Sequence, residues 1–277
     1  MASIVERYDR DAEDYERYWA PVLDRAARDL LDRVEAFVWG MGGGPSVVDV
    51  GTGSGVLALE ASERWPDARI VGTDPSRGML EMARQRVERR GAGEDRVAWI
   101  EASADALPLP DGAVDLVVSS FALQLVPDRA AALREAHRVL RPGGRLAFVT
   151  WLDRGEPFAP SVEFDESVLD LGVEEPEWPD EDVCSGDFRS VRAAADETRR
   201  AGFRRVSARQ ATLAFDWDLA SYLEFKIRYD EIGLFQWLPD EDAHRLVDIA
   251  HRRLAALSPD AFRWRTPVVS VVAERPA

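Results

Sequence analysis

The sequence has very few of the residues that build disulfides and metal centres. Cys184 is the only cysteine and Lys226 the only lysine among 277 residues. One cysteine excludes an internal disulfide and a cysteine-rich metal site, and it fits a reducing compartment. Three histidines, His137, His244 and His251, supply no obvious ligand cluster. We therefore expect no metal.

The sequence also lacks long apolar runs and an excess of positive charge. No run approaches the length of a membrane span, and the acidic amino terminus has no signal-peptide core. The formal net charge of −16 would repel a phosphate backbone. We expect a cytoplasmic protein that spans no membrane and binds no nucleic acid.

What the sequence does contain is an alternation of two patterns. From Ser46 onward, short β-rich runs alternate with helical runs. This order predicts a parallel sheet with helices on both faces. Before it, apolar residues between Val22 and Val38 recur at three- and four-residue steps, which predicts an amphipathic helix, the second of two before the first strand. The run RPGG at 141–144 is interpreted as a helix stop and a tight turn into a strand.

A glycine-rich turn follows the first predicted strand, in the stretch VVDVGTGSG. Gly51, Gly53 and Gly55 stand where doubly wound proteins let a nucleotide-like ligand approach the main chain. The third glycine of a dinucleotide motif would fall on Val56 instead. Asp49 is awkward beside a pyrophosphate but favourable beside an ammonium group. The turn therefore favours a nucleoside that bears an amino acid.

An acidic residue ends the second predicted strand. Asp74, in IVGTDPS, can accept hydrogen bonds from both hydroxyls of a ribose. This position indicates a ribose without showing what is attached to it.

Four stretches in this order carry a family resemblance: VVDVGTGSG, GTDPSRGML, ASADALPLPDGAVDLVVSSFALQLVPD and LREAHRVLRPGGRLAFVTW. Together they resemble the class I S-adenosylmethionine-dependent methyltransferases, and among these the small-molecule enzymes of the ubiquinone/menaquinone-biosynthesis type. The resemblance is close over residues 46–151 and holds only in outline elsewhere. It implies a doubly wound, Rossmann-like α/β fold, with a seven-stranded sheet whose last strand is antiparallel.

The resemblance also implies a division of the chain. Residues 1–45 would be N-terminal helices that cover the cofactor site, and residues 46–151 the S-adenosylmethionine-binding core. Residues 152–277 would complete the sheet and carry a helical cap, with variable substrate segments at about 152–190 and about 216–264 by this resemblance.

The implied cofactor is S-adenosyl-L-methionine, with S-adenosyl-L-homocysteine as product. Asp49 and the glycine turn would contact the methionine portion, and Asp74 the ribose. Many relatives carry an acid or amide where Ser103 stands, so the adenine amino group would use Asp105, a backbone carbonyl or a water. The implied cofactor residues are Tyr15, Asp49, Gly51, Thr52, Gly53, Gly55, Asp74, Pro75, Met79, Ser103, Ala104, Asp105, Ser119 and Ser120.

The sequence names no catalytic residue. Tyr15 is one candidate. It lies in the stretch YERYW, four residues before Trp19, so the two side chains share a helical face. His244 and His251, seven residues apart on one predicted helical face, are the other two. His137 is interpreted as a structural residue of a helix.

The implied activity is in-line transfer of a methyl group to a small organic acceptor. An aromatic segment from Trp217 to Trp237 predicts helical cap packing and an apolar or aromatic acceptor. The acidic run 174–182 is interpreted as a solvated loop. Two alternatives stay open: a nicotinamide-dependent dehydrogenase, and a cofactor-binding protein without catalytic activity. The acceptor and the oligomeric state stay open as well.

Overall fold

The computed structural model describes residues 4–91, 96–153, 155–173 and 183–277. The chain divides into two compact units. The first contains the described parts of 1–154, 181–211 and 267–277, and the second contains those of 155–180 and 212–266. The division at residues 45 and 151 stays a prediction.

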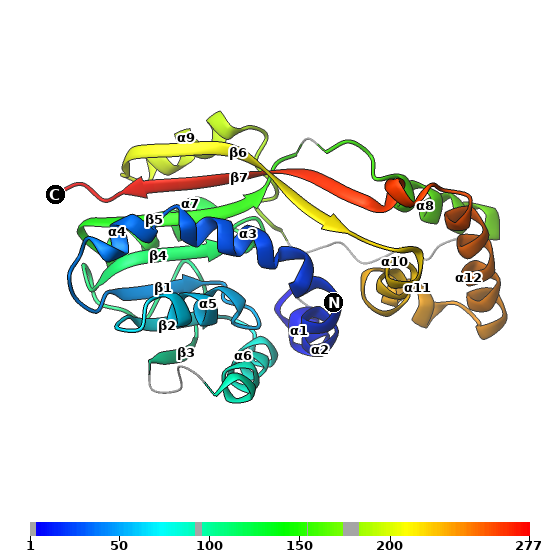
Figure 1. The fold of residues 1–277 in the computed structure, drawn as a ribbon, viewed down its shortest axis with the longest axis horizontal. Helices are drawn as coiled ribbons and strands as arrows, with labels where there is room; N and C mark the ends of the chain where they lie inside the picture. The colour runs from blue at the N-terminus through cyan, green and yellow to red at the C-terminus, as the bar shows by residue number, and fades with distance from the viewer. Residues whose placement is uncertain (1–3, 92–95, 154, 174–182) are drawn as a thin grey trace. The chain divides into compact units, whose positions relative to one another are not determined.

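A seven-stranded sheet lies at the centre of the first unit (Figure 1), in the order β3-β2-β1-β4-β5-β7-β6. Its strands are β1 (Ser46–Val50), β2 (Arg69–Asp74), β3 (Val97–Glu101), β4 (Val114–Ser120), β5 (Leu140–Trp151), β6 (Arg204–Asp216) and β7 (Arg263–Glu274). The first five pair in parallel, and β7 runs antiparallel to β5. The predicted α/β sheet with an antiparallel last strand is confirmed.

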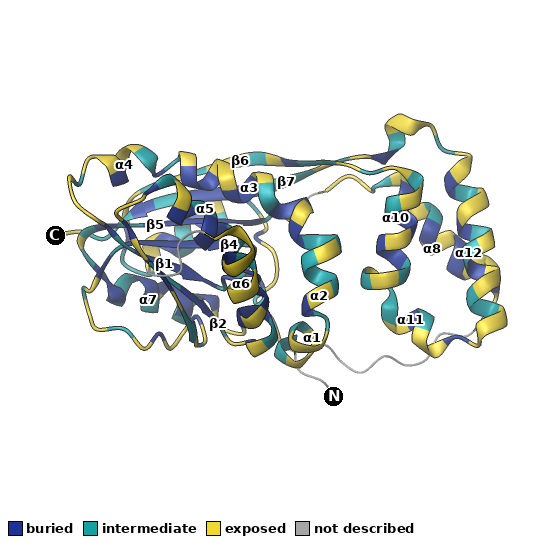
Figure 2. Ribbon diagram, turned by 60° about the horizontal axis from the view of Figure 1, so that its bottom comes forward, coloured by how far each residue is buried: buried dark blue, intermediate teal, exposed yellow. Residues whose placement is uncertain are grey.

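Helices follow the parallel strands in the alternation that the sequence predicts. They are α5 (Val56–Arg64), α6 (Arg77–Arg90), α7 (Arg129–Val139) and, before β6, α9 (Val191–Arg200). Both faces of a parallel sheet must be covered, so its strands are apolar almost throughout. Phe148 of β5 is fully buried, together with Phe188 and Phe203. In Figure 2 the central strands β1 and β4 are mostly dark blue, the colour of buried residues, whereas β6 is mostly teal and yellow.

The region before β1 is more divided than predicted. It contains α1 (Ile4–Arg10), α2 (Ala12–Asp14), η1 (Tyr15–Trp19), α3 (Ala20–Asp32) and α4 (Glu35–Trp39). The single helix predicted between Val22 and Val38 is wrong, because it breaks at Arg33 and Val34. Both amides bond to carbonyls three residues back, which tightens and ends the turn. η1 is a π-helix, in which the Ala20 amide donates to the Tyr15 carbonyl.

The run RPGG at 141–144 is a bulge and not the tight turn predicted before the strand. α7 ends at Val139, and β5 begins at once. Val114 pairs with Leu140 and Leu116 with Arg145, so the extra residues of β5 bulge out between these pairs. Gly143 takes a φ of 78° there. A proline and a left-handed glycine fit a bulge, where regular pairing lapses.

The second unit is helical and has a core of its own. Its helices are α8 (Ala159–Leu171), α10 (Leu219–Phe225), η2 (Lys226–Asp230), α11 (Ile232–Trp237), α12 (Asp240–Ala255) and η3 (Pro259–Phe262). Trp217 packs on Phe225 with ring centroids 4.9 Å apart, and Phe158 packs edge-on against Tyr222 at 5.6 Å. Much of the aromatic segment that began at Trp217 therefore forms packing contacts. The acidic run 174–182 lies outside the described residues.

The buried cation of the second unit is Lys226. Its Nζ donates to Asp230 at 2.6 Å and Glu231 at 2.9 Å, and it lies 4.6 Å from the ring centre of Phe164. Burial favours loss of the proton, but the two carboxylates outweigh it and raise the pKa of Lys226. Lys226 therefore stays charged and ties η2 to the core.

Among the described helices, none combines the length and apolar character needed to cross a membrane.

Candidate functional site

A cavity of about 360 Å³ opens in the first unit, at the carboxyl ends of β1, β2 and β4. In the sheet, β2 lies on one side of β1 and β4 lies on the other, so the direction of the strand order reverses at β1. Ligands of open α/β sheets bind at the carboxyl ends of the strands where this reversal occurs. The sequence-predicted residues that line the cavity are Tyr15, Gly51, Gly53, Asp74, Pro75, Met79, Ser103, Ala104 and Ser120.

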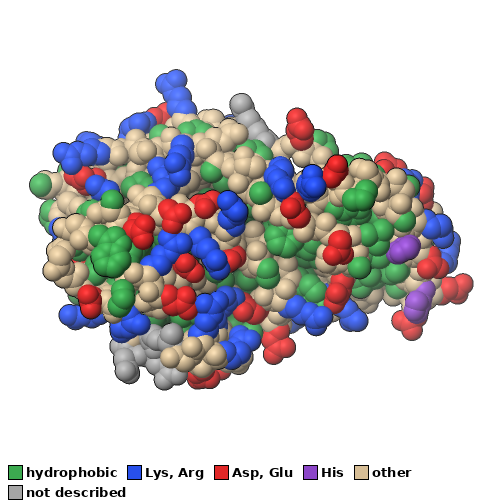
Figure 3. All heavy atoms as spheres, in the orientation of Figure 1, with side chains coloured by type: hydrophobic (Ala, Val, Ile, Leu, Met, Phe, Trp, Pro, Cys, Tyr) green, Lys and Arg blue, Asp and Glu red, His purple; other side chains and the backbone are tan. Residues whose placement is uncertain are grey.

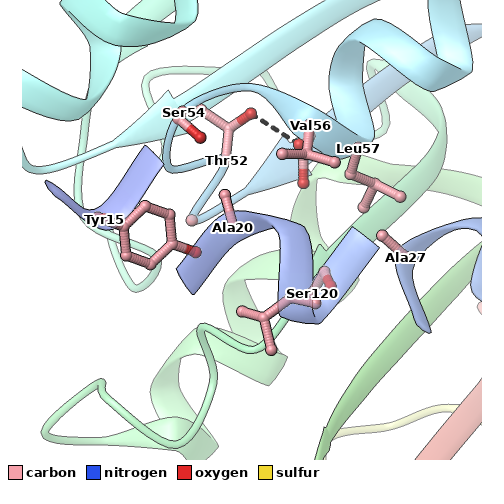
Figure 4. Close-up of a pocket in the computed structure, with 11 residues that line it drawn as sticks. Tyr15, Ala20, Ala27, Thr52, Ser54, Val56, Leu57 and Ser120 are labelled. Carbon is pink, nitrogen blue, oxygen red and sulfur yellow. Dashed lines mark hydrogen bonds between the residues drawn. The ribbon is translucent and has the colours of Figure 1, made fainter. Parts of the chain in front are cut away.

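A smaller cavity of about 30 Å³ adjoins the first, and Figure 4 shows the residues around it. Tyr15, Gly51 and Ser120 line both cavities, whereas Asp49 and Thr52 line only the smaller one. Its volume suits one water molecule or an ammonium group. The two cavities together accommodate a ligand with a bulky part and a small polar end.

Three of the predicted cofactor residues line neither cavity. Ser119 is buried and donates its hydroxyl hydrogen to the Val50 carbonyl at 2.8 Å. Asp105 is exposed and accepts a hydrogen bond from the Ser103 hydroxyl. Gly55 precedes α5, with a φ of 79°. Their assignment to the cofactor stays a prediction.

Glycine is needed for a different physical reason at different positions of the turn. A Cβ on Gly51 would lie 2.2 Å from the Ala122 Cβ, and one on Gly55 would lie 2.8 Å from the Trp99 ring. Both positions therefore need glycine for packing within the protein as well as for their positive φ. A Cβ on Gly53 would meet nothing closer than the Tyr15 ring and hydroxyl, at 3.9 Å. Of the three glycines, Gly53 is therefore the one with open space beside its Cα, and it lines the larger cavity.

Asp74 is held by the turn that it faces. Its Oδ2 accepts from the Gly53 amide at 2.9 Å, and its Oδ1 accepts from the Ser76 amide at 3.0 Å. Burial raises the pKa of Asp74 to about 6, against the opposing effect of these two amides. Each carboxylate oxygen keeps a lone pair for a further donor, as a pair of ribose hydroxyls would require.

Asp49 has an unsatisfied acceptor. The side chain is buried, and its Oδ2 accepts from the Thr52 hydroxyl at 2.6 Å, the bond drawn dashed in Figure 4. Among the described residues, no hydrogen-bond partner reaches Oδ1. Burial, reinforced by Asp74, raises the pKa of Asp49 to about 7, although the Thr52 hydroxyl and the Ala58 amide act in the opposite direction. Since buried acceptors without partners are rare, this oxygen calls for a donor in the adjoining cavity.

The N-terminal helices lie beside α6 (Figure 1) and line the larger cavity with Ile4, Val5 and Tyr8. Asp9 fastens them, because its Oδ1 accepts from the Ser76 hydroxyl at 2.6 Å and from the Gly78 amide at 2.8 Å. Sequence reasoning missed Ile4, Val5 and Asp9. Ser76 could have been found as the N-cap of α6, but nothing local in the sequence pairs it with Asp9.

Tyr15 lies on η1 and lines both cavities (Figure 4). Burial, reinforced by Tyr8 and Asp74, raises its pKa above the usual value. The hydroxyl therefore keeps its proton near neutral pH. This favours a hydrogen-bonding role for Tyr15 over the role of a general base.

The histidines line neither cavity. His244 and His251 are exposed on α12, and the His244 Nδ1 lies 2.6 Å from the Asp240 carbonyl. Histidine side chains are visible in purple on the surface in Figure 3. His137 packs edge-on against Phe203 at 5.1 Å, and burial lowers its pKa. Its contacts are those of a structural residue.

The described side chains also bear on the expectations for a metal site and for surface charge. Over the described ranges, no three histidine, cysteine or acidic side chains are grouped so that they could hold a metal ion. The absence of a metal stays a prediction. Figure 3 shows basic and acidic side chains intermixed on one face of the molecule.

Comparison with known proteins identifies the region around the cavities. Residues 48–148 match the family described as "Methyltransferase domain". Demethylmenaquinone methyltransferase of Thermus thermophilus is 47% identical over 100 residues, which cover 36% of this chain and 44% of that protein. Trans-aconitate 2-methyltransferase of an Azoarcus species is 41% identical over 133 residues, 48% of this chain and 47% of that protein. The chain thus spans about half the length of these curated relatives, or less.

Solved structures resemble the fold over a longer stretch. Phosphoethanolamine N-methyltransferase 2 of Haemonchus contortus, in complex with phosphomonomethylethanolamine and S-adenosylhomocysteine, has a TM-score of 0.59 at 18% identity. The match covers 100% of this chain and 61% of that one. The [4+2]-cyclase SpnF has a TM-score of 0.58 at 19% identity, covering 92% and 81%. At such identity the likeness shows the fold alone.

Proposed function

We propose that this chain, whose residues 48–148 form a class I S-adenosylmethionine-dependent methyltransferase domain, methylates a small organic acceptor with an apolar or aromatic body. The observation that carries the proposal is the pair of carboxylates at two adjoining cavities. Asp74 offers open lone pairs in the larger cavity, and Asp49 offers a buried oxygen without a partner in the smaller one.

The residues fit the cofactor at both ends. The Asp74 carboxylate would accept from the ribose hydroxyls, and Met79 and Ala104 supply apolar walls for the adenine. The free Asp49 oxygen would receive the ammonium group of the methionine portion. A dinucleotide has no ammonium group to offer this oxygen, so the dehydrogenase alternative would leave it to a water molecule in the smaller cavity.

The cofactor supplies a methyl carbon made electrophilic by a positively charged sulfur. The protein then has to align the acceptor with that carbon and keep water out. Ser120 lines both cavities and marks the place where they meet, and Ile4, Val5 and Tyr8 cover the larger one. Positioning of this kind contributes up to roughly 7–11 kcal/mol without a covalent intermediate. We therefore expect catalysis to be spread over several residues.

The acceptor is proposed from the lining of the larger cavity. Beyond Ser120 the wall continues with Phe121, Leu125 and Val126, which suit an apolar or aromatic body. The two curated relatives named above act on different acceptors, since their names specify demethylmenaquinone and trans-aconitate. They support methyl transfer in common and leave the acceptor of this chain to experiment.

Calorimetric titration tests the cofactor. We expect S-adenosylhomocysteine to bind and NADH not to bind. Asp74→Ala should weaken S-adenosylhomocysteine binding at least about tenfold, because a charge-assisted hydrogen bond contributes about 1.5–3 kcal/mol. Asp67→Ala is the matched control, an exposed carboxylate before the start of β2. Binding of NADH without S-adenosylhomocysteine would overturn the proposal.

Methyl transfer itself separates an enzyme from a silent cofactor-binding protein. We expect the protein to move a labelled methyl group from S-adenosylmethionine to at least one member of a panel of small aromatic and apolar metabolites. Transfer should fall in the Asp74→Ala protein and persist in Asp67→Ala. Tight cofactor binding without transfer to any metabolite would favour the silent alternative.

A further inference from the structure

One cavity residue has a backbone conformation that its side chain disfavours. Phe121 follows β4 directly and has a φ of 51°. Left-handed backbone is a genuine outlier for a bulky residue, and such strain persists only where the surroundings hold it in place. Strained residues cluster at binding sites, and Phe121 lines the larger cavity next to Ser120.

Val149 of β5 holds the amide of Phe121, and Gln124, itself bonded to Thr150 of β5, holds its carbonyl. Its amide donates to the Val149 carbonyl at 2.9 Å. Its carbonyl accepts from the Gln124 Nε2 at 2.6 Å, and the Gln124 Oε1 accepts from the Thr150 hydroxyl at 2.6 Å. Only this orientation of the amide satisfies both bonds, since the Phe121 carbonyl can only accept.

The bonded pair is closed off from water. Thr150 is 1% exposed and Gln124 is 7% exposed. A buried amide that lost either partner would leave a polar atom unsatisfied, so the pair is strongly specified. Thr150 thereby sets the Phe121 backbone from the adjacent strand.

Trp151, the next residue of β5, packs against the Phe121 ring. The centroids of Phe121 and Trp151 lie 4.4 Å apart with ring planes at 43°, and Trp151 lies 6.3 Å from Trp19 of η1. Of these three rings, Phe121 lines the cavity, whereas the two tryptophans are not among its lining residues. Tyr8 and Tyr15 line the same cavity, and together with the Phe121 ring they offer aromatic faces on which a flat ligand can stack.

We propose that Gln124 and Thr150 are positioning residues that hold Phe121 as the aromatic wall of the acceptor pocket, and that this wall selects a planar, uncharged aromatic acceptor. The inference rests on the proposed function and assigns a substrate class to the same site. Ala122, Leu125 and Val126 continue the wall without a charged group, in agreement with an uncharged ring.

The test uses 2-naphthol as the probe, titrated by calorimetry into protein saturated with S-adenosylhomocysteine. We expect the wild type to bind 2-naphthol and Phe121→Ala to lose most of that affinity. Thr150→Val and Gln124→Leu should each weaken 2-naphthol binding at least about fivefold, the equivalent of one lost hydrogen bond. The affinity for S-adenosylhomocysteine should change less than about twofold in the same variants.

Conservative rescue and coupling separate positioning from a structural role. Thr150→Ser keeps the hydroxyl and should bind 2-naphthol like the wild type, even if Gln124→Leu fails to fold. Adding Thr150→Val to Phe121→Ala should cost no further 2-naphthol affinity, because the pair acts through the ring. The inference would be overturned if the double variant lost as much 2-naphthol affinity as the two single variants together. It would also be overturned if Thr150→Val bound 2-naphthol like the wild type, or if the cofactor-saturated wild type did not bind it. Failure of S-adenosylhomocysteine to bind would instead overturn the proposed function.

Discussion

The buried carboxylate of Asp49 and the half-buried carboxylate of Asp74, near the ends of β1 and β2, are the groups proposed to bind the cofactor, and their surroundings differ. Asp74 has both oxygens hydrogen-bonded to backbone amides, whereas Asp49 has one oxygen bonded to Thr52 and one without a partner among the described residues. The pKa of Asp49 rises from 3.8 to about 7 because of burial. Without ligand, the folded state holds this proton more tightly than the unfolded chain does. Stability therefore falls as pH rises from about 4 to about 7.

A cation beside Asp49 favours the ionised form, so ligand binding should depend on pH. We expect S-adenosylhomocysteine, which carries an ammonium group, to bind severalfold more tightly at about pH 7.5 than at about pH 6, as the ionised fractions of Asp49 and of Asp74, whose pKa is about 6, both grow. Calorimetry across this range measures the effect. Asp49→Asn should bind more weakly and with a flatter profile, and a wild-type slope in that variant would contradict the assignment.

Among the elements, α1 and α6 form the cover of the larger cavity. α1 supplies Ile4, Val5 and Tyr8 to the lining, and Asp9 binds the first turn of α6 through Ser76 and Gly78. The hydrogen bond from Ser76 holds the pKa of Asp9 below its usual range. A carboxylate at a helix N-terminus also interacts favourably with the helix dipole. Asp9 therefore acts as a latch between two elements far apart in the sequence.

Loss of this latch should speed ligand release. Asp9→Asn removes the charge from the α6 terminus, and we expect the dissociation rate of S-adenosylhomocysteine to rise about threefold to tenfold, as measured by stopped-flow fluorescence. Asp11→Asn is the matched control, because Asp11 bonds to the neighbouring Arg10 and makes none of the α6 contacts of Asp9. Equal release rates in the two variants would show that the latch does not retain the ligand.

At the scale of the whole molecule, the two units have separate cores. Both cavities are lined entirely by residues of the first unit. The second unit packs Phe164, Lys226 and Phe235 around its own centre, with Phe164 fully buried. Cofactor binding and the integrity of the second unit are therefore expected to be separable.

Phe164→Ala tests this separation. The cavity that it opens in the second unit should cost about 3–5 kcal/mol of local stability, measured by urea unfolding followed with circular dichroism. The affinity for S-adenosylhomocysteine in the folded variant should stay at the wild-type value. Phe148→Ala, which removes an equally buried ring from the first unit, is the control and should weaken binding. A matching loss of affinity in Phe164→Ala would show that the units act together.

Local patterns in the sequence predicted the parallel part of the sheet and a nucleoside-type ligand, whereas the antiparallel last strand and the identity of the cofactor followed from the family resemblance. Alternating β-rich and helical runs predicted the parallel strands, because burial on both faces requires continuous apolar runs. Asp49, the glycine turn and Asp74 were found because a strand, a turn and a helix follow one another within a short stretch of chain. The structure brings these residues to two adjoining cavities.

The tertiary structure alone decided how the site is closed and what its walls are. Asp9 meets Ser76, and Phe121 meets Gln124, Thr150 and Trp151, through pairings between elements that no local period links. The bulge at 141–144 likewise follows from the register of β4 against β5. A hydrogen-bond partner or a packing neighbour is chosen by proximity in space, and the sequence around a residue specifies only its local conformation and burial. The residues proposed to bind the cofactor could therefore be predicted from local motifs, whereas those proposed to bind the acceptor depended on long-range contacts.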